Sequence, residues 1–150
     1  MEVEWLILAD HAEIIGGKLY LMGGGWDRLT VNSGFPITKP VGLAAAFSVP
    51  WNETNQPQNV EIEIQSDDGD SIGKMGAQFE VGRPPGMKAG QDQRFQLAAT
   101  LPLTLGAPGG YVVVARVEGQ EAKRVPFNVM AGPILQARQQ PGNPEQGAGE

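Results

Sequence analysis

The sequence predicts an all-β fold: a single antiparallel β-sandwich of about eight short strands. Glycine and proline supply 21 and 12 of the 150 residues and interrupt the apolar segments repeatedly, which disfavours long helices. Several of these segments alternate apolar and polar residues with a period of two. An Asp-Gly pair at 68–69 lies between two of them, as in a hairpin turn.

The first half of the chain contains several strand-like segments. Residues 3–9 (VEWLILA) are apolar on both alternating faces, which is typical of a strand covered on two sides, so Trp5 is expected in the core. Residues 10–17 end in two glycines and are expected to form a hairpin or a short crossover to 18–22 (KLYLM). The remaining segments of this half are 26–31, a connection around Pro36 and Pro40, and 41–49, which ends at Pro50.

The second half shows the clearest alternation of the chain. Residues 60–65 (VEIEIQ) place their aliphatic side chains on one face and polar side chains on the other, so one face is expected to meet water. The turn at 67–70 then leads to a return strand at 72–81. The remaining elements are a loop at 82–93, a strand at 94–105 that is cut by Pro102, and a closing hairpin of 111–117 and 122–129.

Composition divides the chain into two parts. Residues 1–131 are expected to form the sandwich, which at this size can bury a core without disulfides. Residues 132–150 are rich in Gly, Pro and Gln and are expected to be a disordered tail. Such a segment cannot bury enough apolar surface to offset the roughly 1–2 kcal/mol of backbone entropy that each ordered residue loses.

Charge and cysteine content exclude several classes of function. The net charge is −6 and the 11 basic residues are scattered, which argues against nucleic acid and against an anionic membrane surface. The absence of cysteine removes disulfides and thiolate chemistry. No apolar run is long enough to span a bilayer, and the acidic N-terminus does not resemble a secretion signal, so a cytoplasmic location is expected. No cofactor is indicated.

Two stretches resemble a known kind of protein: GGKLYLMGGGWDRLTV at 16–31, and the segment from Gly109 through Val129. The second is similar to the last hairpin of bacterial immunoglobulin-like and Greek-key domains, in which a tyrosine hydroxyl fastens the preceding loop. Together they resemble an uncharacterised actinobacterial β-sandwich family of unknown function over about residues 3–130. The resemblance implies a fold and a structural role for Tyr111, and it implies no activity.

Two groups of ionisable residues have the composition of a metal or catalytic site. His11 is the single histidine and lies between Asp10 and Glu13, but adjacent residues of a strand point to opposite faces, so a solvated or turn-capping role is expected. The other group is a clustered set of carboxylates that resembles a calcium loop without its final Glu, and an Asp-Gly turn needs no metal. Its members are Asp67, Asp68 and Asp70.

Two tryptophans beside polar loops are the candidate contact residues. Tryptophan with neighbouring amides and acids can anchor a protein partner or stack on a sugar, and it can also close the end of a sandwich core. We expect a noncatalytic protein-interaction or scaffold module that has a protein partner or forms a homo-oligomer. The alternatives are a small-ligand or carbohydrate binder, and an enzyme or calcium-binding domain. The candidate residues are Trp26, Asp27, Arg28, Trp51, Asn52 and Asn55.

Overall fold

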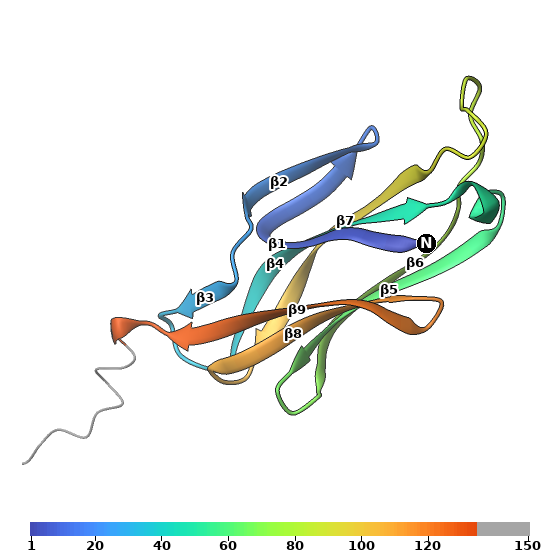
Figure 1. The fold of residues 1–150 in the computed structure, drawn as a ribbon. Coiled ribbons are helices and arrows are strands. Elements are labelled where there is room, and N and C mark those ends of the chain that lie inside the picture. The colour runs from blue at the N-terminus through green and yellow to red at the C-terminus, as the bar shows by residue number, and fades with distance from the viewer. Residues whose placement is uncertain (135–150) are drawn as a thin grey trace, which may run out of the picture.

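The computed structural model describes residues 1–134, which form nine strands and one short 3-10 helix (Figure 1). The nine strands compare with about eight expected. The elements are β1 (Glu2–Ile15), β2 (Lys18–Gly24), β3 (Arg28–Val31), β4 (Ile37–Val49), η1 (Trp51–Glu53), β5 (Pro57–Ser66), β6 (Ser71–Glu80), β7 (Gln93–Leu105), β8 (Gly109–Val117) and β9 (Gln120–Ala131).

Two packed sheets make up the domain, so the predicted β-sandwich is confirmed. Sheet A has the strand order β2-β1-β4-β7, and sheet B has the order β3-β9-β8-β5-β6. Every neighbouring pair is antiparallel except β3 and β9, which run parallel. The parallel pair arises because the short strand β3 crosses from sheet A and joins the edge of sheet B in the direction of β9.

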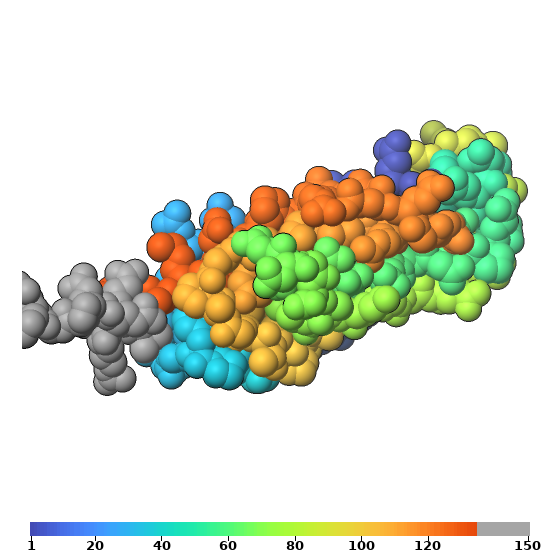
Figure 2. Space-filling view, turned by 90° about the horizontal axis from the view of Figure 1, so that it is seen from below, coloured from blue at the N-terminus to red at the C-terminus, as the bar shows by residue number. Residues whose placement is uncertain are grey.

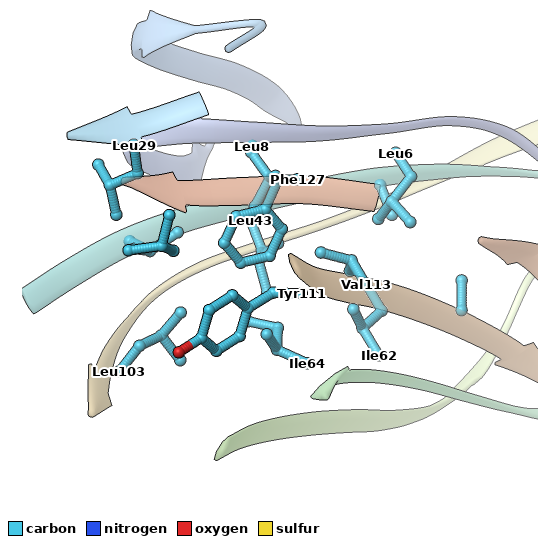
Figure 3. Close-up of a cluster of buried hydrophobic side chains, with 14 of the residues drawn as sticks. Leu6, Leu8, Leu29, Leu43, Ile62, Ile64, Leu103, Tyr111, Val113 and Phe127 are labelled. Atoms are coloured by element: carbon cyan, nitrogen blue, oxygen red, sulfur yellow. The ribbon is translucent and has the colours of Figure 1, made fainter. Parts of the chain in front are cut away.

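The core lies between the inner faces of the two sheets (Figure 3). Phe47 of β4 and Phe127 of β9 are almost completely buried, and burial of one such side chain contributes about 1.5–3 kcal/mol. On β5 the aliphatic residues predicted to face inward do so, and the alternation on that strand is confirmed. Trp5 is a correction: Leu6 and Leu8 point into the core, so Trp5 lies half-buried on the outer face of sheet A.

Tyr111 fastens the loop between β7 and β8. Its side chain is buried, its ring stacks on Phe127 with centroids 5.5 Å apart, and its hydroxyl donates a hydrogen bond of 2.7 Å to the carbonyl oxygen of Ala107. The structural role that the resemblance implied for Tyr111 is confirmed.

Strand β1 bends after Ala9 and turns back over the outer face of sheet A (Figure 1). Up to Ala9 it pairs with β4, and from Ala9 to Ile15 it pairs with β2. Beyond the bend, the amide of Ala12 donates a hydrogen bond of 3.2 Å to Oγ1 of Thr100 on β7, a strand that is not adjacent to β1 in the sheet. Residues 10–17, expected as a hairpin or a crossover, are therefore the first strand and the turn of a hairpin.

Gly42 on β4 makes this crossing possible. A Cβ atom at Gly42 would lie 2.8 Å from the carbonyl carbon of His11 and 2.9 Å from the nitrogen of Ala12. Because both atoms belong to backbone, no side-chain rotation would relieve the contact. At the tip of the hairpin, Gly16 and Gly17 have φ values of 57° and 75°, which glycine adopts without strain.

Pro40, expected in a connection, and Pro102, expected to cut the strand at 94–105, both lie inside strands, whereas Pro50 follows the end of β4 as expected. Pro40 of β4 lies opposite Pro102 of β7, and both strands continue through the pair. At this level β4 pairs with β7 alone, because β1 joins β4 only from Gly42 onward. Each proline therefore has an unpaired side of its strand toward which its nitrogen can face. Residue 131 ends β9, and most of the predicted tail, residues 135–150, lies outside the described residues.

Candidate functional site

The two candidate tryptophans lie at opposite ends of the sandwich and do not form one site. Trp26 precedes β3 and contacts Phe127 of β9, whereas Trp51 follows β4 in η1 at the other end (Figure 1). The length of β4 separates them. The fold therefore does not place both side chains on a single surface.

Trp26 closes the core. Its ring meets that of Phe127 edge to face, with centroids 6.0 Å apart and an interplanar angle of 78°. The side chain is half-buried, and its Nε1 is buried without a hydrogen-bond partner among the described residues. Of the two roles considered for Trp26, these contacts favour closure of the core, because its ring completes an aromatic row with Phe127 and Tyr111. Its neighbours Asp27 and Arg28 are exposed.

Trp51 is covered on one ring face by a residue that is distant in the sequence. The guanidinium carbon of Arg83 lies 3.8 Å from the centroid of the Trp51 ring. Arg83 also donates hydrogen bonds to Oγ1 of Thr54 (2.7 Å) and to the carbonyl oxygen of Trp51 (3.0 Å). The cation therefore fixes the η1 turn and leaves no free platform on that face. Asn52 and Asn55 beside it are exposed.

These contacts lend no support to the sugar-stacking alternative. A ring that binds a sugar presents an open face, whereas Trp26 is packed on its neighbour and Trp51 lies under a guanidinium. No pattern in the sequence linked Arg83 to Trp51, because the two residues meet only when the loop after β6 folds back onto η1.

The acidic turn after β5 is hydrogen-bonded to the start of β8. Oδ2 of Asp67 accepts a hydrogen bond of 3.0 Å from the amide of Gly110, so this carboxylate already has a backbone partner. Asp68 and Asp70 are exposed on the same turn. Within residues 1–134 no three His, Cys, Asp or Glu side chains are grouped so that they could hold a metal ion. The calcium alternative therefore finds no support in this geometry.

His11 lies in β1 beyond the bend and makes polar contacts on the surface. Its Nδ1 is 3.2 Å from Oγ1 of Thr100, and its Nε2 is 3.7 Å from Oε2 of Glu13. His11 and Glu13 share a face because they are two residues apart, whereas Asp10 belongs to the other side. Within the described residues these three side chains form no group that could hold a metal ion.

A hollow of about 800 Å³ lies on the outer face of sheet B, which is the face seen in Figure 2. Its polar lining includes Asp67 and Arg124, and both are engaged: Asp67 with Gly110, and Arg124 with Glu121 at 2.7 Å. A ligand would have to compete with these bonds, so the hollow has few free polar groups to offer.

A charged network covers another part of the same sheet face. Arg116 on β8 pairs with Glu61 (2.9 Å) and Glu63 (2.7 Å) on β5. A hydrogen bond from Gln65 and the pairing with Arg116 lower the pKa of Glu63 from its usual value. Val114 of β8 is completely buried although it points toward this face, so the network covers apolar surface instead of exposing it.

The exposed large hydrophobic side chains of residues 1–134 are concentrated on the β1–β2 hairpin. Five large hydrophobic side chains are exposed in residues 1–134, and three of them belong to this hairpin: Ile15 (55% exposed), Tyr20 (49%) and Met22 (68%). The cross-strand pairs His11–Met22, Glu13–Tyr20 and Ile15–Lys18 place all three on the same side. We name this surface the hairpin face; it consists of His11, Glu13, Ile15, Lys18, Tyr20 and Met22.

Within residues 1–134, strand β2 also has an edge with which no other strand pairs. Because Ile15 and Lys18 close a two-residue turn, they exchange hydrogen bonds, and alternate residues of β2 direct their amide and carbonyl groups away from β1. Those residues are Leu19 and Leu21. The hydrogen bond from the Ala12 amide to Thr100 agrees with this alternation of inward and outward backbone groups. Ala12 lies opposite Leu21, and its amide also points away from the hairpin.

The other three sheet edges are protected in the ways that natural sheets use. Strand β3 has only four residues. Strand β7 contains Pro102, and its Phe95 stacks on Phe79 of β6 with ring centroids 3.6 Å apart, which closes that side of the sandwich. Strand β6 carries Lys74 at its centre. The seven residues of β2 contain no proline, and their one charge, Lys18, stands at the first position.

Part of the hairpin face was predictable from the sequence. The alternation in 18–22 placed Lys18, Tyr20 and Met22 together, but a period of two does not tell which face of a strand is covered. The deciding information is the bend in β1, which turns Leu19 and Leu21 toward the domain and leaves Tyr20 and Met22 in solvent.

The fold and this surface define a two-sheet β-sandwich with an added hairpin that presents an apolar face and an open strand edge. The chain belongs to the family of unknown function DUF6941, whose model matches residues 4–130. Comparison with curated proteins finds no match. Within residues 1–134 no helix is both long enough and apolar enough to cross a membrane.

Proposed function

We propose that this domain is a noncatalytic protein-interaction module that binds an extended, partly apolar strand of a protein partner at the β1–β2 hairpin. The observation that carries the proposal is the joint placement of three exposed apolar side chains and an open strand edge on one small element. An exposed apolar group of this kind marks an interaction site more often than a scattered single residue does.

The open edge supplies a general means of binding. A partner strand that pairs with β2 would receive hydrogen bonds from the outward amide and carbonyl groups of Leu19 and Leu21. These backbone hydrogen bonds do not depend on the side chains of the partner strand, so they contribute affinity and orientation. Selectivity then has to come from the hairpin face beside the edge.

The hairpin face has the composition of a small binding surface. Tyr20 and Met22 are residue types that are enriched at interfaces, and both are at the free strand β2. His11, Glu13 and Lys18 supply polar groups around them. A partner strand with apolar side chains at alternate positions would cover Tyr20 and Met22 while its backbone pairs with β2.

The domain also holds the hairpin in a defined position. Besides the bond between Ala12 and Thr100, Nε2 of Gln96 on β7 donates a hydrogen bond of 3.3 Å to the carbonyl oxygen of Gly17 at the tip. A hairpin anchored at both its middle and its tip loses less conformational entropy on binding than a mobile one. This anchoring favours binding by the hairpin in the conformation that it already has.

Site-specific photocrosslinking in the protein's own cells tests the proposal. Tyr20 is replaced by p-benzoylphenylalanine, and Lys123, an exposed residue of β9, is replaced in a control. We expect a defined protein adduct from position 20 and none from position 123. The adduct should be lost when Met22→Lys and Ile15→Lys are added. Equal adducts from both positions, or none from position 20, would refute the proposal.

A further inference from the structure

We infer that the strand bound at β2 is β2 of a second copy of this chain, so that the domain forms a two-fold dimer through its hairpin. The inference rests on the proposed function and names the partner. A two-fold interface brings the same patch of each copy together, so the patch has to be complementary to itself. Strand β2 meets this condition in its backbone, its charges and its side chains.

The backbone of β2 selects one register. In antiparallel pairing centred on Tyr20, Leu19 of one copy lies opposite Leu21 of the other, and these are the residues whose amide and carbonyl groups point outward. The two pairs would form four hydrogen bonds. A register centred on Leu21 would need Gly23, which has a φ of 60° and therefore departs from extended geometry.

The charges of the hairpin permit two copies to meet although the whole chain carries a net charge of −6. From His11 to Met22 the sequence contains one acid, Glu13, and one base, Lys18, so this element is neutral when His11 is uncharged. In the register centred on Tyr20, each Lys18 lies opposite Met22 of the other copy. Neither acid faces an acid and neither base faces a base.

The side chains that are exposed in the monomer become each other's neighbours in this arrangement. The two Tyr20 side chains lie directly opposite one another on the joined face, and aromatic pairs across antiparallel strands stabilise a sheet. Met22, the most exposed of the three apolar residues at 68%, lies beside the aliphatic part of Lys18 from the other copy. One pairing thus covers both exposed apolar residues of β2, Tyr20 and Met22.

The contact is small, which places the dimer among weak associations. Two strands of seven residues bury less than the roughly 1,200 Å² at which stable interfaces begin. The dimer should therefore form progressively as concentration rises, with no fixed stoichiometry at low concentration. This dependence provides the test.

Sedimentation velocity of the full chain is measured from about 1 to about 500 µM, a range that covers weak dissociation constants. Amide hydrogen exchange is followed in the same samples. We expect the mass to rise from one chain toward two, with exchange at Leu19 and Leu21 slowing in parallel by at least about fivefold. Tyr20→Lys with Met22→Lys should abolish both changes. The control Gln78→Lys with Lys123→Glu, at exposed positions of sheet B, should change neither.

Each outcome decides the inference. A chain that stays monomeric over the whole range, with Leu19 and Leu21 exchanging at a constant rate, would overturn the dimer. If position 20 still forms a crosslink with a different protein, the proposed function stands and only the identity of the partner is wrong. A dimer that forms without protection of Leu19 and Leu21 would use another surface, and it would also overturn the inference.

Discussion

Gly42→Ala perturbs the position of the hairpin with the smallest possible change. The added methyl group would lie 2.8 Å from the His11 carbonyl carbon and 2.9 Å from the Ala12 nitrogen, closer than a real Cβ atom approaches either. Since both neighbours are backbone, β1 has to move. Forcing an extra methyl group into a well-packed region costs roughly 1–3 kcal/mol. Replacing glycine by alanine in a strand otherwise contributes roughly 0.5–1 kcal/mol, so a net loss of stability is expected.

Gly76→Ala on β6 is the matched control. It is the same change in a strand, but the nearest atom to the new methyl group is the carbonyl oxygen of Val60 at 3.4 Å, an ordinary contact. Urea unfolding should show a lower midpoint for Gly42→Ala and an equal or higher midpoint for Gly76→Ala. Hydrogen exchange at Ala12 should be faster in Gly42→Ala. Wild-type stability with unchanged exchange at Ala12 would refute the account of the crossing.

Three further predictions concern single side chains. Tyr111→Phe removes the hydrogen bond to Ala107 and should lower the free energy of unfolding by about 1 kcal/mol in urea titrations; an unchanged midpoint would contradict the fastening role. Because the folded-state pKa of Glu63 is lowered, its contribution to stability is present above the unfolded pKa and is lost as pH falls through the folded value. Glu63→Gln should therefore reduce the loss of stability below about pH 4.5, measured by thermal unfolding, whereas an unaltered acid dependence would argue against it. Dilute peroxide should oxidise Met22 before Met75, which is half-buried, and peptide mass spectrometry showing the reverse order would contradict the exposure of the hairpin face.

The parts of the fold that depend on local pattern were predictable from the sequence. The alternation of residues 60–65, the Asp-Gly turn at 68–69 and the tyrosine at 111 each express a requirement of a few adjacent residues. Strand periodicity and turn geometry are local properties, so they are visible without knowledge of the rest of the chain. About eight such strands at short spacing are typical of sandwiches and barrels, which limits the architecture to these two.

The features that depend on distant contacts were not predictable. The apolar segment 3–9 suggested that Trp5 is buried, because a strand pattern does not reveal that the chain bends at Ala9 and leaves the outer face of sheet A partly open. Nothing near Trp51 in the sequence indicated Arg83 above its ring. The parallel pairing of β3 with β9 likewise depends on where a four-residue strand reaches the opposite sheet.

The structure places the candidate contact surface on other residues than the sequence suggested, for the same reason. The tryptophans were sought as contacts because they are large and adjoin polar loops, but one closes the core and the other holds an arginine. The hairpin face was composed of residues whose alternation was visible in the sequence. Its exposure is a consequence of Gly42, a residue about twenty positions away that lets β1 cross β4.

Crosslinking from two neighbouring positions of β2 tests the central claim most directly. Photoreactive residues at positions 20 and 22 are compared, and the crosslinked residues of the partner are mapped by mass spectrometry. Pairing at the β2 edge predicts acceptor sites about two residues apart on one partner strand, because both positions lie on one face of a strand. If the partner is a second copy, the two-fold dimer also predicts that the acceptor sites follow in antiparallel order. Acceptor sites scattered over the partner, or the same sites reached from position 123, would contradict binding at the hairpin.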